Sequence, residues 1–497
     1  MRKGQLMAGF DRAGLKGVYL CALTESEVEQ VHDGALQTLA KTGIIIRDDV
    51  ILALLDEAGC QVSRRRWDYH VRIPADVVEN AVAKAPPTVT LSDRFGEPAM
   101  VLGAGPLHAR SSSGATRILD LESARRREPT RQDAADAARV ADALPHILGV
   151  STMAVQPADV PAATVDLHAV RITLANTVKP LGYVCLNARL IQPALAMFAA
   201  VAGGEEALRR RPIVSALAES TSPLQLVPSQ LAVLRAFASR GLPLTLHAHP
   251  MAGFTAPVTL AGELVITHAE ILSLVAIAQL LRPGTPVVYG MSSSVPDMRS
   301  GTNLAGAVEI GLLGVATAQL ARRCGLPCVM SSGTDARQPG TQAVMERLMT
   351  LLPPALAGAD LVNLSTLESK MAFSLEQLVL DDAVLSVVER YLRGIGVDPE
   401  TIGLDLIDEV GPRGAFVSTD HTVRHFREEL LDLDLVRDHP LGPRQDTGGS
   451  SMQARARDDV RRILAEHRPV PLADGIAAQL DEIIEEAETQ VHPLLVR

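Results

Sequence analysis

The chain has 497 residues and a mass of 52.9 kDa, so it can form one large α/β domain with additions or several smaller domains. Hydrophobic residues make up 47% of it and charged residues 21%, which excludes a disordered or fibrous protein and indicates a soluble globular one. The formal net charge is -11, so the protein as a whole does not attract nucleic acid or an anionic membrane electrostatically. We therefore expect small molecules or another protein as partners.

Cysteine usage and apolar runs bear on the location of the protein. The five cysteines are too few and too scattered for a disulfide framework, so we expect a reducing, cytoplasmic environment. The apolar stretch at 17–23 is too short for a secretion signal. No run approaches 18 uncharged apolar residues, so we expect no membrane-spanning helix.

Residues 1–110 are predicted to form an α+β lobe that caps the rest of the chain. Thr24 and Glu27 have the spacing of a capping box, and apolar residues then recur at helical spacing until Gly43. Further helices are predicted at 48–58 and 74–85, and β-type segments at 43–46, 61–73 and 88–108. A small-residue joint, Ser111–Gly114, precedes a helix that begins after Thr130 and ends near Leu144.

From residue 147 onward, short β-type runs alternate with longer helical runs. The strands are predicted at 147–155, 181–186, 213–218, 244–248, 287–291, 328–331, 361–364 and 415–418. The helices between and after them are predicted at 162–177, 192–202, 229–239, 261–281, 304–323, 341–357, 374–394 and 400–409. This alternation favours parallel strands with right-handed crossovers, and eight of them suit a (β/α)8 TIM barrel over residues 111–440.

An open doubly wound sheet is the alternative to the barrel, although the chain lacks both the G-x-G-x-x-G fingerprint and the P-loop of nucleotide-binding sheets. Residues 441–497 are predicted to form a carboxyl-terminal extension. It consists of a Pro/Gly/Ser linker at 442–451 and two helices at about 452–466 and 473–489.

The loops after the predicted strands are rich in polar residues. Because a TIM barrel places its chemistry at the carboxyl ends of its strands, we expect these residues to surround one cavity. One residue per loop represents the set: Gln156, Asn187, Glu219, His247, Ser292, Asp335 and His421.

Two features of these loops allow more than one interpretation. His247 and His249 point the same way on a strand, as two metal ligands would, but only Asp297 or His421 could complete the set, and we expect no metal. Tyr183, Phe254 and Tyr289 lie close to the predicted mouth. They form either barrel core or, with Glu219, an aromatic wall for an alkylammonium cation.

The order of motifs along the chain resembles the trimethylamine methyltransferase family. The resemblance extends nearly from end to end and is most specific at 250–262 and at 297–309. The other matching stretches are 133–144, 156–161, 222–224, Asp335 and Ala336 with Gln342 and Glu346, Asp381 and Asp382, Gly411 and Pro412, His421 and Thr422, and His425 and Phe426.

The resemblance implies a TIM barrel that moves a methyl group from a methylated amine to the cobalt of a separate corrinoid protein docked over the mouth. Some members of the family carry pyrrolysine, whereas this chain contains only standard residues and therefore resembles the branch that demethylates quaternary amines such as glycine betaine. It implies no tightly bound cofactor in the chain itself, and a homo-oligomer is compatible with it.

Within this interpretation each candidate residue has an expected role. The catalytic residues would be Glu219, His247, Asp335 and His421. The substrate-binding residues would be Tyr183, Phe254, Tyr289, Ser292, Arg299 and Gln342. Those that face the corrinoid would be Gln156, Asn187, Asp297, Ser332 and Gly333. A tertiary methylamine methyltransferase, a divalent-metal hydrolase built on His247, His249 and Asp297, and a betaine-binding barrel without turnover remain as alternatives.

Overall fold

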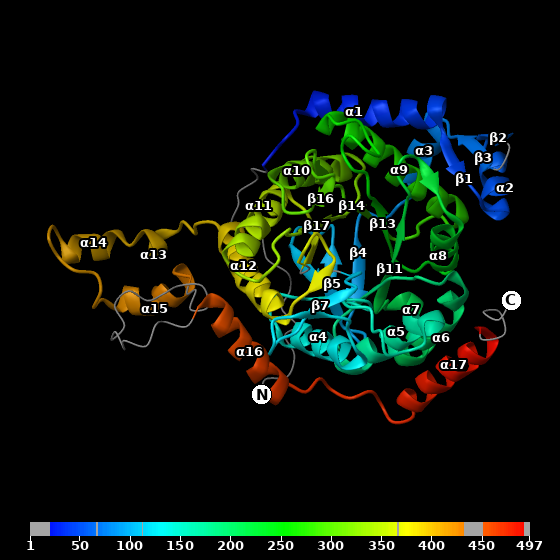
Figure 1. Ribbon diagram of the computed structural model, residues 1–497. Coiled ribbons are helices and arrows are strands. Elements are labelled where there is room, and N and C mark those ends of the chain that lie inside the picture. Colours follow the sequence, from blue (N-terminus) through cyan, green and yellow to red (C-terminus); the bar gives the residue numbers. More distant parts are fainter. Residues whose placement is uncertain (1–19, 66–67, 112, 365–366, 432–450, 492–497) are drawn as a thin grey trace.

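Eight parallel strands form the centre of the molecule (Figure 1). In this computed structural model, which describes residues 20–65, 68–111, 113–364, 367–431 and 451–491, their order is β6-β18-β17-β14-β13-β11-β10-β9. A parallel bridge between Arg110 and Gly149 joins the two ends of the sheet and closes it into a barrel. The strands are β6 His108–Ser111, β9 Val150–Ser151, β10 Leu181–Tyr183, β11 Val214–Glu219, β13 Leu244–Ala248, β14 Val287–Met291, β17 Cys328–Ser331 and β18 Leu361–Leu364.

The predicted TIM barrel is confirmed, and seven of its strands lie within or close to their expected ranges. Helices connect successive strands and surround the barrel, as right-handed crossovers require. They are α4 Arg131–Ala143, α5 Val165–Asn176, α6 Ile191–Ala202, α7 Glu205–Arg210, α8 Pro228–Ala238, α9 Leu260–Leu281, α10 Val308–Arg323, α11 Thr341–Ala357 and α12 Leu375–Arg393.

The eighth predicted strand, 415–418, is wrong: these residues form no strand. The eighth strand is β6, which pairs with β18 and lies across the predicted boundary between residues 110 and 111. Its sequence, His-Ala-Arg-Ser, does not have the apolar character of a core strand, yet all four residues are buried. Because the inner face of β6 lines a polar cavity, its hydrophobic pattern is lost there.

The amino-terminal lobe packs on α9 (Figure 1). It contains α1 Glu25–Gln37, the π-helical turn η1 Thr38–Thr42, β1 Ile44–Ile46, α2 Asp49–Glu57, β2 Gln61–Arg65, β3 Asp68–Arg72 and α3 Ala75–Val82. The capping box predicted at Thr24 and Glu27 is present, and Thr130 and Asp133 form another at the start of α4. The predicted strand 61–73 is a hairpin, and β12 Gln225–Leu226, from the loop after β11, joins the lobe's sheet next to β1.

A hairpin closes the amino-terminal end of the barrel. It consists of β4 Val89–Ser92 and β5 Pro98–Leu102. Its apolar side chains, including Leu91 and Met100, pack in one cluster with Val288, Val329 and Leu361 from the barrel strands. The barrel interior is therefore filled at this end, and a cavity opens at the carboxyl ends of the strands.

Small sheets lie at the carboxyl-terminal end of the barrel strands. The loop after β14 forms the hairpin β15 Val295–Asp297 and β16 Thr302–Leu304. The loops after β6 and β18 share a sheet of β7 Arg117–Leu119, β8 Arg126–Arg127 and β19 Ala372–Phe373. Two short 3-10 turns, η2 Ala162–Thr164 and η3 Ala188–Leu190, precede α5 and α6. These loops define the rim of the mouth.

Helix α9 is long and apolar enough to cross a membrane by length and composition, and within the described residues it is the only such helix. Most of it is buried between the barrel and the amino-terminal lobe, because α1 and α3 cover its outer side. It is therefore a core helix of the fold.

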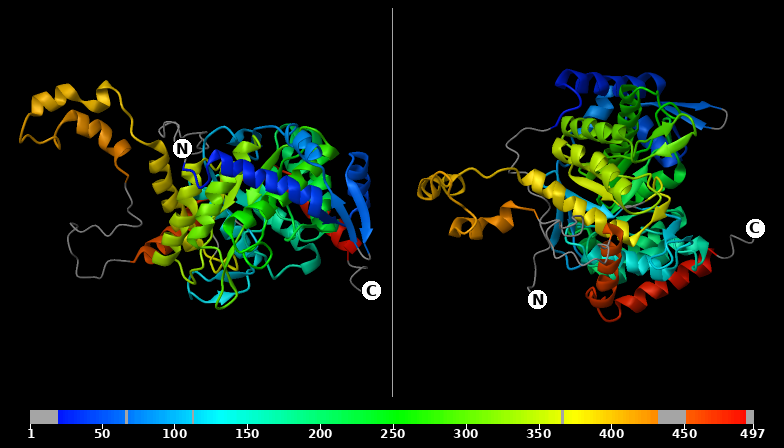
Figure 2. Two further views of the ribbon diagram at one scale, coloured as in Figure 1. Left: turned by 90° about the horizontal axis from the view of Figure 1, so that it is seen from above. Right: turned by 60° about the vertical axis from the view of Figure 1, so that its left-hand side comes forward.

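The carboxyl-terminal part divides into an arm and two packed helices. The arm, α13 Pro399–Ile402, α14 Leu404–Val410 and α15 Asp420–Glu429, projects away from the barrel (Figure 2) and contains no buried residue. The two helices predicted for the carboxyl-terminal extension are both present. Helix α16 Met452–Glu466 packs against α12 and α4, and helix α17 Ile476–Val491 packs against α6 and α5. Residues 442–450 of the predicted linker lie outside the described residues.

Candidate active site

A cavity of about 280 Å³ opens at the carboxyl ends of the barrel strands. Its wall contains residues from every strand or from the loop that directly follows it, and most of these residues are polar. Its charged side chains and imidazoles are those of Arg110, Glu219, His247, His249 and Lys370. This is the position at which TIM barrels carry their active sites.

His247 lies on β13 with its side chain in the cavity wall, as predicted. Its Nδ1 is 3.1 Å from Ser292 Oγ, which is in turn 2.7 Å from Ser331 Oγ. Its Nε2 is buried without a hydrogen-bond partner among the described residues. Burial, together with the nearby charges of Lys370 and Arg110, lowers the pKa of His247 well below its usual value. The imidazole is therefore neutral near pH 7 and acts as a hydrogen-bonding group.

Among the described residues that line the cavity, Glu219 at the end of β11 is the only carboxylate. Burial raises the pKa of Glu219, while the positive charge of Lys370 opposes this rise. Burial also lowers the pKa of Lys370 to about 8, and the charge of Glu219 opposes that fall. The two groups therefore influence each other across one cavity, and each favours the charged form of the other.

Lys370 follows β18 in an unusual backbone conformation. Glu368, Ser369 and Lys370 have φ angles of 51°, 52° and 79°, a left-handed run that non-glycine residues rarely adopt. Backbone hydrogen bonds hold the run to the loop after β17, from Glu368 N to Ala336 O and from Ser369 N to Thr334 O. Such locally unfavourable backbone conformations persist where the surrounding structure fixes them, often at functional sites.

Asp335 belongs to the support of this run rather than to the cavity wall. Its carboxylate accepts hydrogen bonds from Ala305 N at 2.7 Å, from Gly306 N at 3.0 Å and from the Ser369 hydroxyl. The side chain predicted to be catalytic thus ties the loops after β14, β17 and β18 together, directly beside Lys370.

Arg110 of β6 is a buried residue of the cavity wall. Its Nε donates to Asn363 Oδ1 at 3.0 Å and its Nη1 to Ser215 Oγ at 3.1 Å. Sequence reasoning missed both Arg110 and Lys370. The only signal for Arg110 was a charged residue between short apolar runs, and Lys370 lies in a loop whose conformation has no sequence signature.

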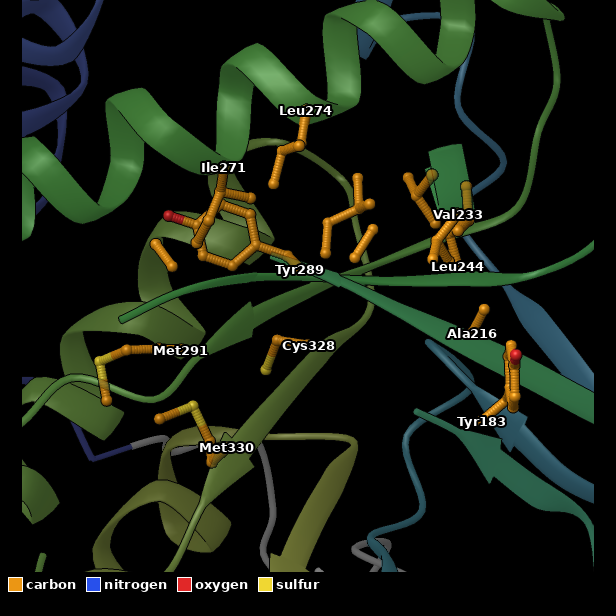
Figure 3. Packing of buried hydrophobic residues seen from close by; sticks show 14 of the residues in the cluster. Tyr183, Ala216, Val233, Leu244, Ile271, Leu274, Tyr289, Met291, Cys328 and Met330 are labelled. Carbon is orange, nitrogen blue, oxygen red and sulfur yellow. The ribbon is translucent and has the colours of Figure 1, made fainter. Parts of the chain in front are cut away.

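The aromatic residues do not form the wall that one interpretation predicted. Tyr183 borders the cavity, but its ring packs outward against Phe198 and Phe237, with centroids 5.5 and 6.0 Å away. The Tyr289 ring is directed toward α9 beside Ile271 (Figure 3), and its hydroxyl lies 2.7 Å from His268 Nδ1. Tyr183 and Tyr289 are therefore barrel core, which was the alternative interpretation.

Three further predicted residues lie in the rim without lining the cavity. Phe254 is 59% exposed, the Arg299 side chain is 94% exposed, and Asp297 caps the turn that carries Arg299 and Ser300. Gln156 also does not line the cavity, and Gln342 bonds Glu346 on the first turns of α11.

Asn187, Ser332 and Gly333 have structural partners. Asn187 donates its side-chain amide to Ala163 O and caps the turn before α6. Ser332 is buried, with its Oγ 2.7 Å from Thr350 Oγ1. A Cβ on Gly333 would lie 2.6 Å from the Cβ of Ala305, so glycine allows these two loops to touch.

His421 is not at the mouth. It lies on α15 in the arm, where its Nε2 is 3.0 Å from Glu400 O and its ring lies 4.4 Å from that of His425. His421 was expected at the mouth because residues 415–418 were predicted to form the eighth barrel strand. These residues lie in the arm, so the segment that follows them does not reach the barrel. The metal set His247, His249 and Asp297 also does not assemble within the described residues, where only two other groups have such geometry.

The chain is similar in sequence to known methyltransferases along nearly its whole length. Residues 16–491 match the family described as trimethylamine methyltransferase (MTTB). The trimethylamine methyltransferase MttB of Desulfitobacterium hafniense is 32% identical over 98% of both chains, and the glycine betaine methyltransferase of the same species is 30% identical over 94% of this chain and 97% of its own. Among solved structures, the monomethylamine methyltransferase of Methanosarcina barkeri covers 98% of this chain and 99% of its own with a TM-score of 0.47 and 11% identity.

Proposed function

The chain belongs to the trimethylamine methyltransferase family, and on this premise we propose that it transfers a methyl group from a betaine, a quaternary amine with a carboxylate, to the Co(I) centre of a separate corrinoid protein. Membership of the family makes it a methyltransferase for methylated amines. The betaine and the corrinoid acceptor are the proposed parts. A cytoplasmic location belongs to the proposal, since the five scattered cysteines are too few for a disulfide framework.

Similarity alone does not select the substrate, because relatives named for trimethylamine and for glycine betaine match at 32% and 30% identity. The residues of the cavity must decide. The observation that carries the proposal is that this open, polar cavity contains one carboxylate, Glu219, among the charged groups of its wall. A quaternary ammonium group carries a fixed positive charge at every pH, and Glu219 offers it the complementary charge.

The chemistry agrees with this choice. When a quaternary amine loses a methyl group, a neutral tertiary amine leaves, so no proton has to be supplied to the leaving group. Catalysis then depends mainly on positioning and on a complementary electrostatic environment. The neutral imidazole of His247, fixed by Ser292, and the wall hydroxyls of Ser215 and Ser331 supply such an environment without adding charge.

A corrinoid fits above the site and not inside it. The cavity of about 280 Å³ admits a small amine but not a corrinoid macrocycle, so the acceptor would approach the substrate methyl group over the mouth. Its reduced cobalt would supply the nucleophile. Of the residues predicted to face the corrinoid, Asn187, Ser332 and Gly333 hold neighbouring loops together. The loops that carry Gln156 and Asp297 therefore remain as candidates for contact with the corrinoid protein.

A product analysis tests the proposal. Purified protein is incubated with glycine betaine whose three N-methyl groups carry deuterium, with and without a reduced corrinoid protein as acceptor. We expect deuterated dimethylglycine by mass spectrometry only when both proteins are present. Release of dimethylglycine without the acceptor, or no release under any condition with an active acceptor, would contradict the proposed function.

A further inference from the structure

Three lysine or arginine side chains are buried within the described residues: Arg110, Lys179 and Arg347. A buried cation is costly unless a carboxylate or several hydrogen-bond acceptors compensate it. The compensation of each of the three therefore indicates whether it serves the fold or awaits another partner.

Two of these cations are fully compensated by the fold. Arg347 on α11 forms a paired contact with Asp381, from Nε to Oδ1 at 3.0 Å and from Nη2 to Oδ2 at 3.1 Å. Lys179 donates to three backbone carbonyls, those of Ala141, Leu144 and Ile147. Both side chains are structural.

Arg110 differs from both. It has two neutral acceptors, Asn363 Oδ1 and Ser215 Oγ, and within the described residues no carboxylate lies within 4.0 Å of it. Its Nη2 makes no hydrogen bond to a described residue. Burial lowers the pKa of Arg110 to about 10, which still leaves it charged near neutral pH. An uncompensated guanidinium therefore forms part of the cavity wall.

The position of the guanidinium is fixed by its neighbours. A Cβ on Gly182 of β10 would lie 2.9 to 3.0 Å from Nη1, Cζ and Nε of Arg110, so the guanidinium lies directly against the glycine backbone. The bonds of Nε to Asn363 and of Nη1 to Ser215 leave Nη2, in the wall of the cavity, as the nitrogen without a partner among the described residues. Such a preorganised fork matches the geometry of a carboxylate.

We propose that Arg110 is the receptor for the substrate carboxylate, which would accept hydrogen bonds from the free edge of the guanidinium. The inference rests on the proposed function. Arg110 bonds Ser215, which lies four residues before Glu219 on β11, so the guanidinium lies deeper in the barrel than Glu219 at the end of that strand. Lys370 lies in the loop after β18. A betaine held by its carboxylate at Arg110 directs its ammonium group toward Glu219 and its methyl groups toward the mouth.

The charge balance of the cavity favours a zwitterion over a bare cation. With the imidazoles neutral, the wall carries the positive charges of Arg110 and Lys370 against the single negative charge of Glu219. A betaine brings a carboxylate for the excess positive charge, whereas tetramethylammonium adds a third cation. Arg110 thus becomes the residue that selects carboxylate-bearing quaternary amines.

Binding measurements test this role independently of turnover. Isothermal titration of the full-length protein compares glycine betaine with betaine amide, which has nearly the same shape but no carboxylate charge. We expect the wild-type protein to bind glycine betaine at least 100-fold more tightly than the amide. In Arg110→Met this preference should disappear, and in Arg110→Lys, which keeps the charge but not the fork, it should recover in part.

Arg235→Met, on the outer helix α8, is the matched control and should keep the full preference, with thermal unfolding as the check on folding. Equal wild-type affinity for the two ligands would overturn the inference even if no Arg110 variant folded, and so would an unchanged preference in Arg110→Met. The product analysis above separates this failure from that of the proposed function. If the protein demethylates glycine betaine but the Arg110 variants keep the preference for the carboxylate, only the role of Arg110 is refuted. If binding depends on the carboxylate and Arg110 but no methyl group is transferred, only the proposed function is refuted.

Discussion

The imidazole of His247 on β13 lies directly over the backbone of Gly290 on the neighbouring strand β14. A Cβ at position 290 would lie 1.9 Å from Cδ2 and 2.4 Å from Nε2 of the ring, far inside van der Waals contact. The absence of a side chain at Gly290 therefore creates the space that His247 occupies in the cavity wall, and the bond to Ser292 fixes the ring there.

Substitution of Gly290 by alanine tests this relationship. The new methyl group must displace the imidazole and break its bond to Ser292, so we expect kcat/KM to fall by about 100-fold, with a loss of stability of about 1–3 kcal/mol from overpacking. Kinetics and thermal unfolding measure the two effects. Gly396→Ala, where no atom lies within 4 Å of the new methyl group, is the control and should leave both unchanged.

Substitution of Glu219 by glutamine removes the carboxylate that the described part of the cavity wall contains and preserves the shape of the side chain. We expect KM for a quaternary amine to rise by about 10-fold or more with a smaller change in kcat, because the lost attraction acts on the cation in the ground state as well. Steady-state kinetics at saturating acceptor measure the split. Glu206→Gln, on the exposed helix α7, should have no effect; an unchanged KM in Glu219→Gln would refute the assigned role.

Asp335 is expected to act by positioning the loop of Lys370. In Asp335→Asn one acceptor oxygen is replaced by a donor that faces backbone N–H groups or the Ser369 hydroxyl, at a cost of about 1–3 kcal/mol. We expect faster amide hydrogen exchange at 367–372 and a raised KM. If activity fell while exchange in that segment stayed as in the wild type, Asp335 would have a direct role instead. Asp405→Asn in the arm is the control.

The strands of the barrel could be predicted because most of them are short apolar runs between helices, and seven were found. β6 could not, because a strand whose inner face carries Arg110 lacks the apolar signature. Its omission moved the eighth strand to 415–418 and placed His421 at the mouth. One missed strand thus produced the largest error at the site.

The side chains that face the cavity were only partly predictable. Strands of a parallel barrel are buried on both faces, so their sequences show no alternation that separates inside from outside. Tyr183 and Tyr289 therefore looked like candidates for the wall although their rings face the helices. Glu219 and His247 were found because they end strands, whereas Lys370 reaches the cavity through a left-handed backbone run that no sequence pattern predicts.

His146 should make stability depend on pH. Its Nδ1 contacts Asp382 at 2.9 Å and its Nε2 contacts Glu389 at 3.4 Å. Burial lowers the pKa of His146, but the two carboxylates outweigh it and raise the pKa to about 9. Because the folded-state pKa exceeds the unfolded value, the stabilisation is complete below about pH 6.5 and disappears as pH rises through 9.

The variant His146→Gln isolates this contribution. We expect its free energy of unfolding to be lower than that of the wild type by about 1–3 kcal/mol at pH 6. Above pH 9.5 this difference should be close to zero. Chemical denaturation of both proteins at each pH gives the difference directly, and contributions from other titrating groups cancel. A difference that stayed constant from pH 6 to 9.5 would show that the histidine is not charged in the folded protein.

The most direct test of the whole account is a competition between two methylated amines. Glycine betaine and trimethylamine are supplied together at equal concentration with a reduced corrinoid protein as acceptor, and the consumption of each is followed by mass spectrometry. The ratio of consumption rates gives the ratio of the two kcat/KM values. We predict that glycine betaine is favoured by at least 100-fold; preferential consumption of trimethylamine would contradict the account.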